Sequence, residues 1–126
     1  MQRVFILDDN QDFGQTLVKM VRSLGFDCVA FTLSEDFIAA VKIQPPSLYL
    51  VDMWLGNTTA LKIQKKHADL LSAIPGILMS GGGGGSSLET VTAKAEIEGF
   101  RDVIYKPFSR DELKAVLHKV FQDHDT

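Results

Sequence analysis

The chain has 126 residues, a length that suits one domain, and we expect residues 1–126 to form a single domain with no output domain attached. Its composition is 45% hydrophobic and 23% charged, which is typical of a globular protein with its own core. The formal net charge of −3 argues against the basic surface of a nucleic-acid-binding protein, so no direct contact with nucleic acid is expected. No apolar stretch approaches the roughly 20 residues of a membrane span, and the one cysteine, Cys28, suits a reducing cytoplasm.

The first half of the chain alternates between strand-like and helix-like patterns. Short apolar runs predict strands at residues 4–7, 28–31 and 48–51. The third run has no polar alternation, which is typical of a parallel strand covered on both faces. Apolar residues at helical spacing predict a first helix that stops at Gly25, and Ser34 is expected to cap a second helix.

The same alternation continues in the second half. A loop after the third strand leads to a predicted helix over residues 59–70, and further strands are predicted at residues 77–79 and 103–105. Two pairs have the spacing of a capping box that opens a helix: Ser86 with Glu89, and Ser109 with Glu112. The last helix has the clearest amphipathic pattern in the chain, carried by Leu113, Val116, Leu117, Val120 and Phe121.

Strands that alternate with helices predict the α/β class: a single doubly wound sheet of five parallel strands joined by right-handed crossovers. Ligands of such sheets bind beyond the carboxyl ends of the strands. Polar residues stand directly after four of the five apolar runs: Asp8 and Asp9, Asp52, Ser80, and Lys106. In a parallel sheet these side chains would share one edge.

Three carboxylates gathered in one place need compensating positive charge. Two like charges 4 Å apart repel by about 4 kcal/mol at an effective dielectric constant of 20. Lys106 supplies one positive charge, and a hard cation such as Mg²⁺, which prefers oxygen ligands, would supply the rest. Beside such a cation a carboxylate can attack phosphorus, and Asp52, a single acid after the most buried-looking strand, is the best nucleophile candidate.

Over nearly its whole length the chain resembles the receiver domains of bacterial two-component response regulators. The matching segments are Phe5-Ile6-Leu7-Asp8-Asp9-Asn10, Leu50-Val51-Asp52, Met79-Ser80 and Tyr105-Lys106-Pro107-Phe108. The resemblance implies a flavodoxin-like sheet with strand order 2-1-3-4-5. It also implies that Asp52 accepts a phosphoryl group from a sensor histidine kinase or a histidine phosphotransfer protein.

The resemblance also implies a role for each matching residue. Asp8, Asp9 and Asp52 would hold Mg²⁺ together with the backbone carbonyl of Trp54. Ser80 would contact the phosphoryl oxygens and Lys106 would pair with them, and the Lys106–Pro107 peptide bond would be cis. Phosphorylation would switch a surface formed by the fourth helix, the fifth strand and the fifth helix, which could also form a homodimer.

The chain departs from the family pattern at several positions. Gly56 and Ala60 stand where the family usually has proline and glycine, and Val103 replaces the aromatic residue that usually turns inward with the switch hydroxyl of Ser80. The glycine run at residues 81–85 is either a flap that orders on phosphorylation or a tolerated insertion. Trp54 either shields the phosphorylated site from water or contacts a partner.

We therefore expect a signalling switch that catalyses only its own phosphorylation and dephosphorylation. The alternative is a receiver-like interaction module that works without phosphorylation, which the valine at position 103 and the glycine run favour. A third hypothesis, an aspartyl-phosphate hydrolase of the haloacid dehalogenase type, requires Asp-x-Asp at a strand end. Both Asp8-Asp9-Asn10 and Asp52-Met53-Trp54 lack that motif.

Overall fold

The computed structural model describes residues 2–81 and 99–125. Its centre is one five-stranded sheet in which each pair of neighbouring strands is parallel and the order is β2-β1-β3-β4-β5. The strands are β1 (Arg3–Leu7), β2 (Asp27–Phe31), β3 (Leu48–Asp52), β4 (Gly76–Ser80) and β5 (Asp102–Tyr105). The α/β class and the strand order expected from the sequence are confirmed.

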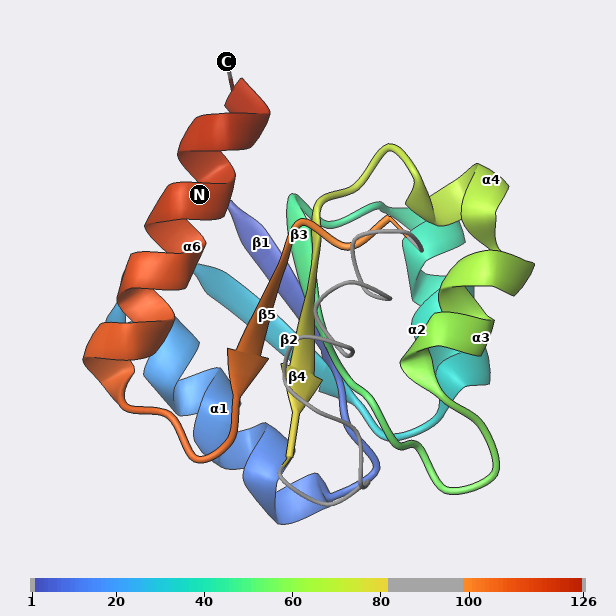
Figure 1. Cartoon of the computed structure of the whole chain (residues 1–126), viewed down its shortest axis with the longest axis horizontal. Coiled ribbons are helices and arrows are strands. Elements are labelled where there is room, and N and C mark those ends of the chain that lie inside the picture. Colours follow the sequence, from blue (N-terminus) through green and yellow to red (C-terminus); the bar gives the residue numbers. More distant parts are fainter. Residues whose placement is uncertain (1, 82–98, 126) are drawn as a thin grey trace.

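Helices cover both faces of this sheet (Figure 1). The described helices are α1 (Gln11–Ser23), α2 (Ser34–Ile43), α3 (Ala60–Lys66), α4 (Ala68–Leu71) and α6 (Arg110–Asp125). Helix α1 begins after Asn10, whose side chain accepts a hydrogen bond from the backbone N–H of Phe13, and is followed by Gly25 with φ of +97°. The second capping box is present, because Ser109 and Glu112 each donate a backbone N–H to the other's side chain.

Two helix predictions were wrong in detail. Ser34 does not cap α2 but is its first residue, and the capping position belongs to Leu33, which makes no side-chain hydrogen bond there. The helix expected over residues 59–70 is broken at His67, where the backbone leaves the helical region with φ of −114° and ψ of 33°. The helix predicted from Ser86 and Glu89, and most of the glycine run, lie outside the described residues.

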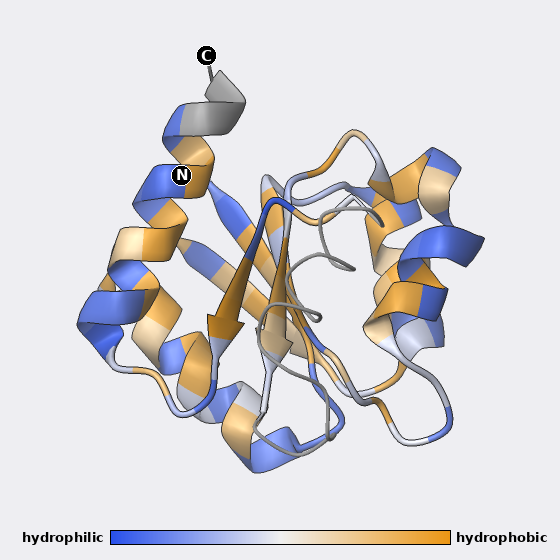
Figure 2. Ribbon diagram, viewed as in Figure 1, coloured by the Kyte–Doolittle hydropathy of each residue, from blue (hydrophilic) through white to orange (hydrophobic). Residues whose placement is uncertain are grey.

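The two faces of the sheet bury separate apolar clusters, because neighbouring side chains on a strand point to opposite faces. We call them the α1/α6 face and the α2/α3 face. Val4 and Ile6 of β1 pack on the α1/α6 face, whereas Phe5 and Leu7 pack on the α2/α3 face. Figure 2 shows apolar residues concentrated along the strands and alternating with hydrophilic residues along the helices.

Cys28 lies in the α1/α6 cluster with no exposed surface, as expected for a small core residue. Burial raises the pKa of its thiol to about 12. Among the described helices, none has both the length and the apolar composition that crossing a membrane requires.

Candidate functional site

The alternation of side chains explains why acidic and basic residues meet at one edge of the sheet. The α1/α6 cluster contains every second residue of three strands: Val4 and Ile6, Leu48 and Leu50, and Ile104. Two positions after Ile6, Leu50 and Ile104, at or just past the strand ends, come Asp8, Asp52 and Lys106. Because parallel strands end at the same edge and the register aligns Leu7 with Val51, these three residues are brought together although they are distant in sequence.

Lys106 forms ion pairs with two of the carboxylates. Its Nζ lies 2.8 Å from Asp8 Oδ2 and 3.1 Å from Asp52 Oδ1. The Asp8 side chain is almost completely buried, and its second oxygen accepts a hydrogen bond from the backbone N–H of Asn10 at 2.9 Å. Both oxygens of Asp8 are therefore used to fix the position of the carboxylate.

The three acidic residues form a cluster suited to a hard cation. One carboxylate oxygen each from Asp8, Asp9 and Asp52 lies within 4.8 Å of the others. The set contains only oxygen ligands, which Mg²⁺ and Ca²⁺ prefer, and Lys106 balances only one of the three negative charges. The residues present therefore fit a divalent cation, with Asp9 as the exposed member at the mouth of the cluster.

The charges of the site shift two pKa values in a consistent way. Burial raises the pKa of the Asp52 carboxyl, the hydrogen bond and charge of Lys106 oppose this, and the charges of Asp8 and Asp9 reinforce it, so the net pKa is raised. Burial alone would lower the pKa of the Lys106 ammonium, but its hydrogen bonds to Asp8 and Asp52 outweigh burial and raise it. The lysine is therefore held in its charged form beside a carboxylate whose charged form is disfavoured.

The loop after β3 passes directly beside Asp9. A methyl group built on Gly56 would lie 3.8 Å from Asp9 Oδ2, and Gly56 has φ of +77°. Proline, with φ fixed near about −65°, cannot adopt that backbone, so a proline at position 56 would require a different loop conformation. The loop is closed by an antiparallel bridge between Trp54 and Thr59, and the Trp54 side chain is 56% exposed.

The two residues expected to take part in the switch, Ser80 and Val103, lie on the neighbouring strands β4 and β5. Ser80 is buried at the end of β4 and its hydroxyl donates to the carbonyl oxygen of Gly81 at 3.3 Å, while its own carbonyl accepts from the Lys106 backbone N–H at 2.8 Å. Val103 packs against the α2/α3 cluster. The Lys106–Pro107 peptide bond is cis, as the resemblance implied.

The sequence did not predict two contacts, one at the site and one on the α2/α3 face. The Lys106 Nζ lies 4.2 Å from the centre of the Phe13 ring, whereas helical spacing had marked Phe13 only as an apolar residue of α1. On the other face, the buried Tyr49 hydroxyl donates to Gln64 of α3. Local periodicity contains no signal for either contact, because each joins separate elements.

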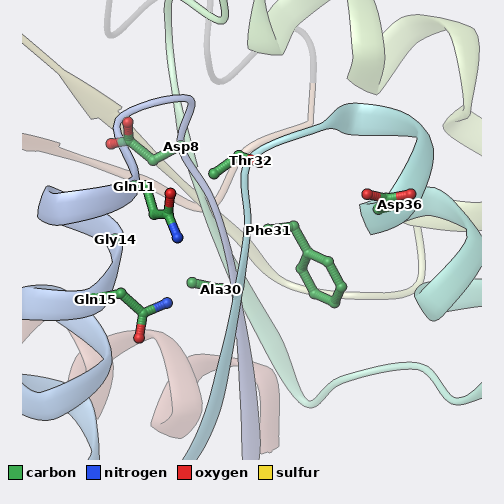
Figure 3. Close-up of a pocket in the computed structure, with 8 residues that line it drawn as sticks. All are labelled: Asp8, Gln11, Gly14, Gln15, Ala30, Phe31, Thr32 and Asp36. Carbon is green, nitrogen blue, oxygen red and sulfur yellow. The ribbon is translucent and has the colours of Figure 1, made fainter.

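A pocket of about 240 Å³ borders the site between α1, β2 and the start of α2. Figure 3 shows the carboxamides of Gln11 and Gln15 extending from α1 toward Ala30, with Asp36 on the far side of Phe31. The Asp8 carboxylate points away from these side chains in this view. The pocket therefore extends from Asp8 along α1 and β2, away from the direction in which the Asp8 carboxylate points in Figure 3.

With this geometry established, comparison with known proteins identifies the family. A sequence model of the response regulator receiver domain matches residues 4–118. The chain belongs to the response regulator receiver family. Receiver domains are signalling switches of two-component systems, and the acidic cluster occupies the sheet edge where ligands of this fold class bind.

The curated relatives are response regulators about twice as long as this chain. The cell cycle transcriptional regulator CtrA of Caulobacter vibrioides is 28% identical over 118 residues, which cover 94% of this receiver chain and 49% of the relative. The response regulator protein TodT of Pseudomonas putida is 28% identical over 110 residues, covering 87% of this chain and 47% of the relative. One further relative is a DNA-binding response regulator, so these relatives lend no support to the expectation that nucleic acid is not a partner.

Solved structures match the fold over almost the entire chain. NtrX from Brucella abortus has a TM-score of 0.88 at 21% identity and covers 98% of this chain, which spans 27% of that protein. A receiver domain protein from Clostridium thermocellum has a TM-score of 0.86 at 13% identity, with 99% of this chain and 98% of that one covered. At these identities the likeness establishes the fold alone.

Proposed function

We propose that this receiver domain is a phosphoacceptor switch, in which Asp52 receives a phosphoryl group from a histidine kinase or a histidine phosphotransfer protein in the presence of Mg²⁺. The observation that carries the proposal is the position of the Asp52 carboxylate, 3.1 Å from the Lys106 ammonium and clustered with the oxygens of Asp8 and Asp9. A nucleophile next to a fixed cation and a set of metal ligands is the arrangement that phosphoryl transfer requires.

The transfer itself needs little from the protein beyond positioning and charge. A carboxylate oxygen of Asp52 forms the new O–P bond while the P–N bond of the donor phosphohistidine breaks, and the imidazole leaves with the electron pair of that bond. Lys106 offsets negative charge on the phosphoryl oxygens, and the Ser80 hydroxyl would donate to one of them. Asp8, Asp9, Asp52 and the Trp54 carbonyl would hold Mg²⁺, which when bound neutralises charge on the phosphoryl group.

The phosphorylated carboxylate would change the charge of this edge of the sheet and shift a two-state surface. We place that surface on β5 and α6, together with the helix expected from residues 86 onward, and infer that it contacts the downstream partner or a second copy of the chain. The receiver would catalyse only its own phosphorylation and dephosphorylation. The single buried, free thiol of Cys28 is compatible with a cytoplasmic location.

The proposal is tested by incubating the protein with acetyl phosphate and Mg²⁺ and measuring the intact mass. We expect one acid- and base-labile adduct with the mass of a single phosphoryl group, and none after addition of EDTA. The variant Asp52→Asn should form no adduct, whereas Asp69→Asn, which changes an exposed acid in α4, should react like wild type.

The same experiment separates the switch from a module that works without phosphorylation. Val103 favours such a module, since it packs against the α2/α3 cluster at the position where the family has an inward-turning aromatic residue. Absence of an adduct in wild type under saturating donor and Mg²⁺ would leave that module as the better proposal. Multiple turnovers of donor, with no adduct remaining, would instead support a hydrolase.

A further inference from the structure

The Lys106 ammonium lies over the aromatic ring of Phe13. The Nζ atom lies 4.2 Å from the centre of the Phe13 ring, well within the distance at which an aromatic face attracts a cation. The Lys106 side chain is only 22% exposed, so the ring replaces part of the water that would otherwise surround the ammonium. Such contacts are stronger where water is partly excluded.

The ring is itself held in place by its neighbours. Phe13 lies in the first turn of α1, and its backbone N–H donates to the capping side chain of Asn10 at 3.0 Å. The ring of Phe108 packs edge-on against it, with ring centres 6.1 Å apart and planes at 81°. Both rings also contact the α1/α6 cluster, so the first turn of α1 and the segment after β5 form one aromatic support under Lys106.

The proposed phosphoryl transfer would alter the carboxylate contacts of Lys106 but not its contact with Phe13. Its two carboxylate partners are Asp8 and Asp52. Phosphoryl transfer would convert one Asp52 oxygen into the bridging oxygen of an acyl phosphate, and a bound cation would compete for Asp8. The contact with Phe13 involves no carboxylate, so neither phosphorylation of Asp52 nor a cation at Asp8 competes for it. A flexible four-carbon side chain benefits from such a constant partner, because it otherwise has several rotamers available.

We propose that Phe13 is a positioning residue, whose aromatic face keeps the Lys106 ammonium in place for the phosphoryl group throughout its transfer to Asp52. This inference rests on the proposed function, since it assigns Phe13 a part in that reaction. It predicts that the aromatic character of position 13 matters, beyond its apolar volume.

The test compares Phe13→Leu, which keeps an apolar side chain but removes the aromatic face, with Phe13→Tyr, which keeps the face. Phe26→Leu is the matched control, because Phe26 is a partly buried ring on the same face of the sheet that stacks on Phe121 at 5.3 Å. The rate constant of adduct formation is measured with acetyl phosphate at saturating Mg²⁺. We expect it to fall about tenfold in Phe13→Leu and to stay near wild type in Phe13→Tyr and Phe26→Leu.

A second measurement does not depend on phosphorylation. In the free protein, the ring current of Phe13 should move the NMR signals of the Lys106 ε-methylene group upfield, and this shift should disappear in Phe13→Leu but remain in Phe13→Tyr and Phe26→Leu. Loss of the upfield shift together with the slow reaction supports the inference.

The outcomes separate this inference from the proposed function. If wild type reacts and Phe13→Leu reacts as fast as Phe26→Leu, the inference is overturned while the phosphoacceptor function stands. If wild type forms no adduct, the proposed function is overturned, and the role of Phe13 in phosphoryl transfer falls with it even when the upfield shift is present. Absence of the upfield shift in wild type overturns the inference in either case.

Discussion

Side chains alternate between the two faces of the sheet, and the two faces carry different polar groups. On the α1/α6 face, apolar residues are succeeded at the strand ends by Asp8, Asp52 and Lys106, which are linked by ion pairs. On the α2/α3 face the apolar cluster is joined by a buried hydrogen-bonded pair, Tyr49 and Gln64. One face thus concentrates charge at its edge, and the other satisfies its polar groups internally.

This difference places the uncompensated charge of the described residues at the acidic cluster. In the described part of the chain, no buried side-chain nitrogen or oxygen lacks a hydrogen-bond partner, so the polar groups of the α2/α3 face make no further demand on a ligand. The acidic cluster has three carboxylates for one ammonium and therefore attracts cations.

The largest expected effect is that Asp52→Asn abolishes phosphorylation without unfolding the protein. Burial, opposed by Lys106, raises the pKa of the Asp52 carboxyl, so the folded state binds the proton more readily than the unfolded state. Wild type should therefore lose stability relative to Asp52→Asn as the pH rises from below 3.8, the ordinary value, through the raised pKa. Denaturation at several pH values without divalent ions measures this, and a variant less stable than wild type at neutral pH would contradict it.

Removing Lys106 should lower the free energy of unfolding more than removing an exposed charge would. Lys106→Met leaves Asp8, with a side chain 1% exposed, and Asp52 without their ion pairs, which should cost about 3 kcal/mol of unfolding free energy. Lys119→Met is the matched control, because it breaks an ion pair with Asp102 whose lysine side chain is 64% exposed and should cost less than about 1 kcal/mol. Urea denaturation compares the two, and equal losses would show that the buried pairs are no stronger than the exposed one.

Addition of Mg²⁺ sharpens this comparison. A cation that binds only the folded state stabilises it by about 2.7 kcal/mol at a concentration of 100 times its Kd. Mg²⁺ should therefore stabilise wild type, and should recover part of the loss in Lys106→Met by balancing the carboxylate charges that no longer have an ion-pair partner. No recovery is expected for Lys119→Met at the same Mg²⁺ concentration beyond the gain seen in wild type.

A pair of glycine substitutions tests packing on the two faces. A Cβ on Gly76 would lie 2.3 Å from Cζ of the buried Tyr49, so Gly76→Ala should cost about 1–3 kcal/mol through overpacking. A Cβ on Gly14 in α1 would lie 3.6 Å from the Ala30 Cβ, an ordinary contact, so Gly14→Ala should be neutral or gain up to about 1 kcal/mol. Thermal denaturation measures both, and a stable Gly76→Ala would mean that the Tyr49 ring can move aside.

The smallest expected effect concerns the lifetime of the phosphorylated state. Trp54 lies in the loop that follows Asp52, and we expect its indole to hinder water, so Trp54→Asn should lose phosphate a few-fold faster than wild type. Leu33→Asn is a control of equal exposure, 55% against 56%, at a distant position before α2. If both variants keep the wild-type lifetime, the exposed indole is better explained as a contact for a partner.

Much of the fold and the composition of the site followed from local patterns. Uninterrupted apolar runs predicted the strands to within one residue at each end, and the capping box of Ser109 and Glu112 predicted the start of α6. Patterns failed where the local signal was weak. The helix over residues 59–70 has little amphipathic periodicity, and it breaks at His67. Ser34 is an equally good residue for a cap and for the first turn, so its sequence position did not distinguish them.

By itself, the sequence determined which chemical groups stand at the strand ends, because runs of apolar residues and the residues that terminate them are local properties of the chain. Only the tertiary structure decided their pairing: Lys106 meets Asp8 across 98 positions, Phe13 lies under the same ammonium, and Gly56 adopts a positive φ beside Asp9. Such contacts arise when separate elements pack on one sheet, and the free energy that selects them is a property of the whole core, which no short segment encodes.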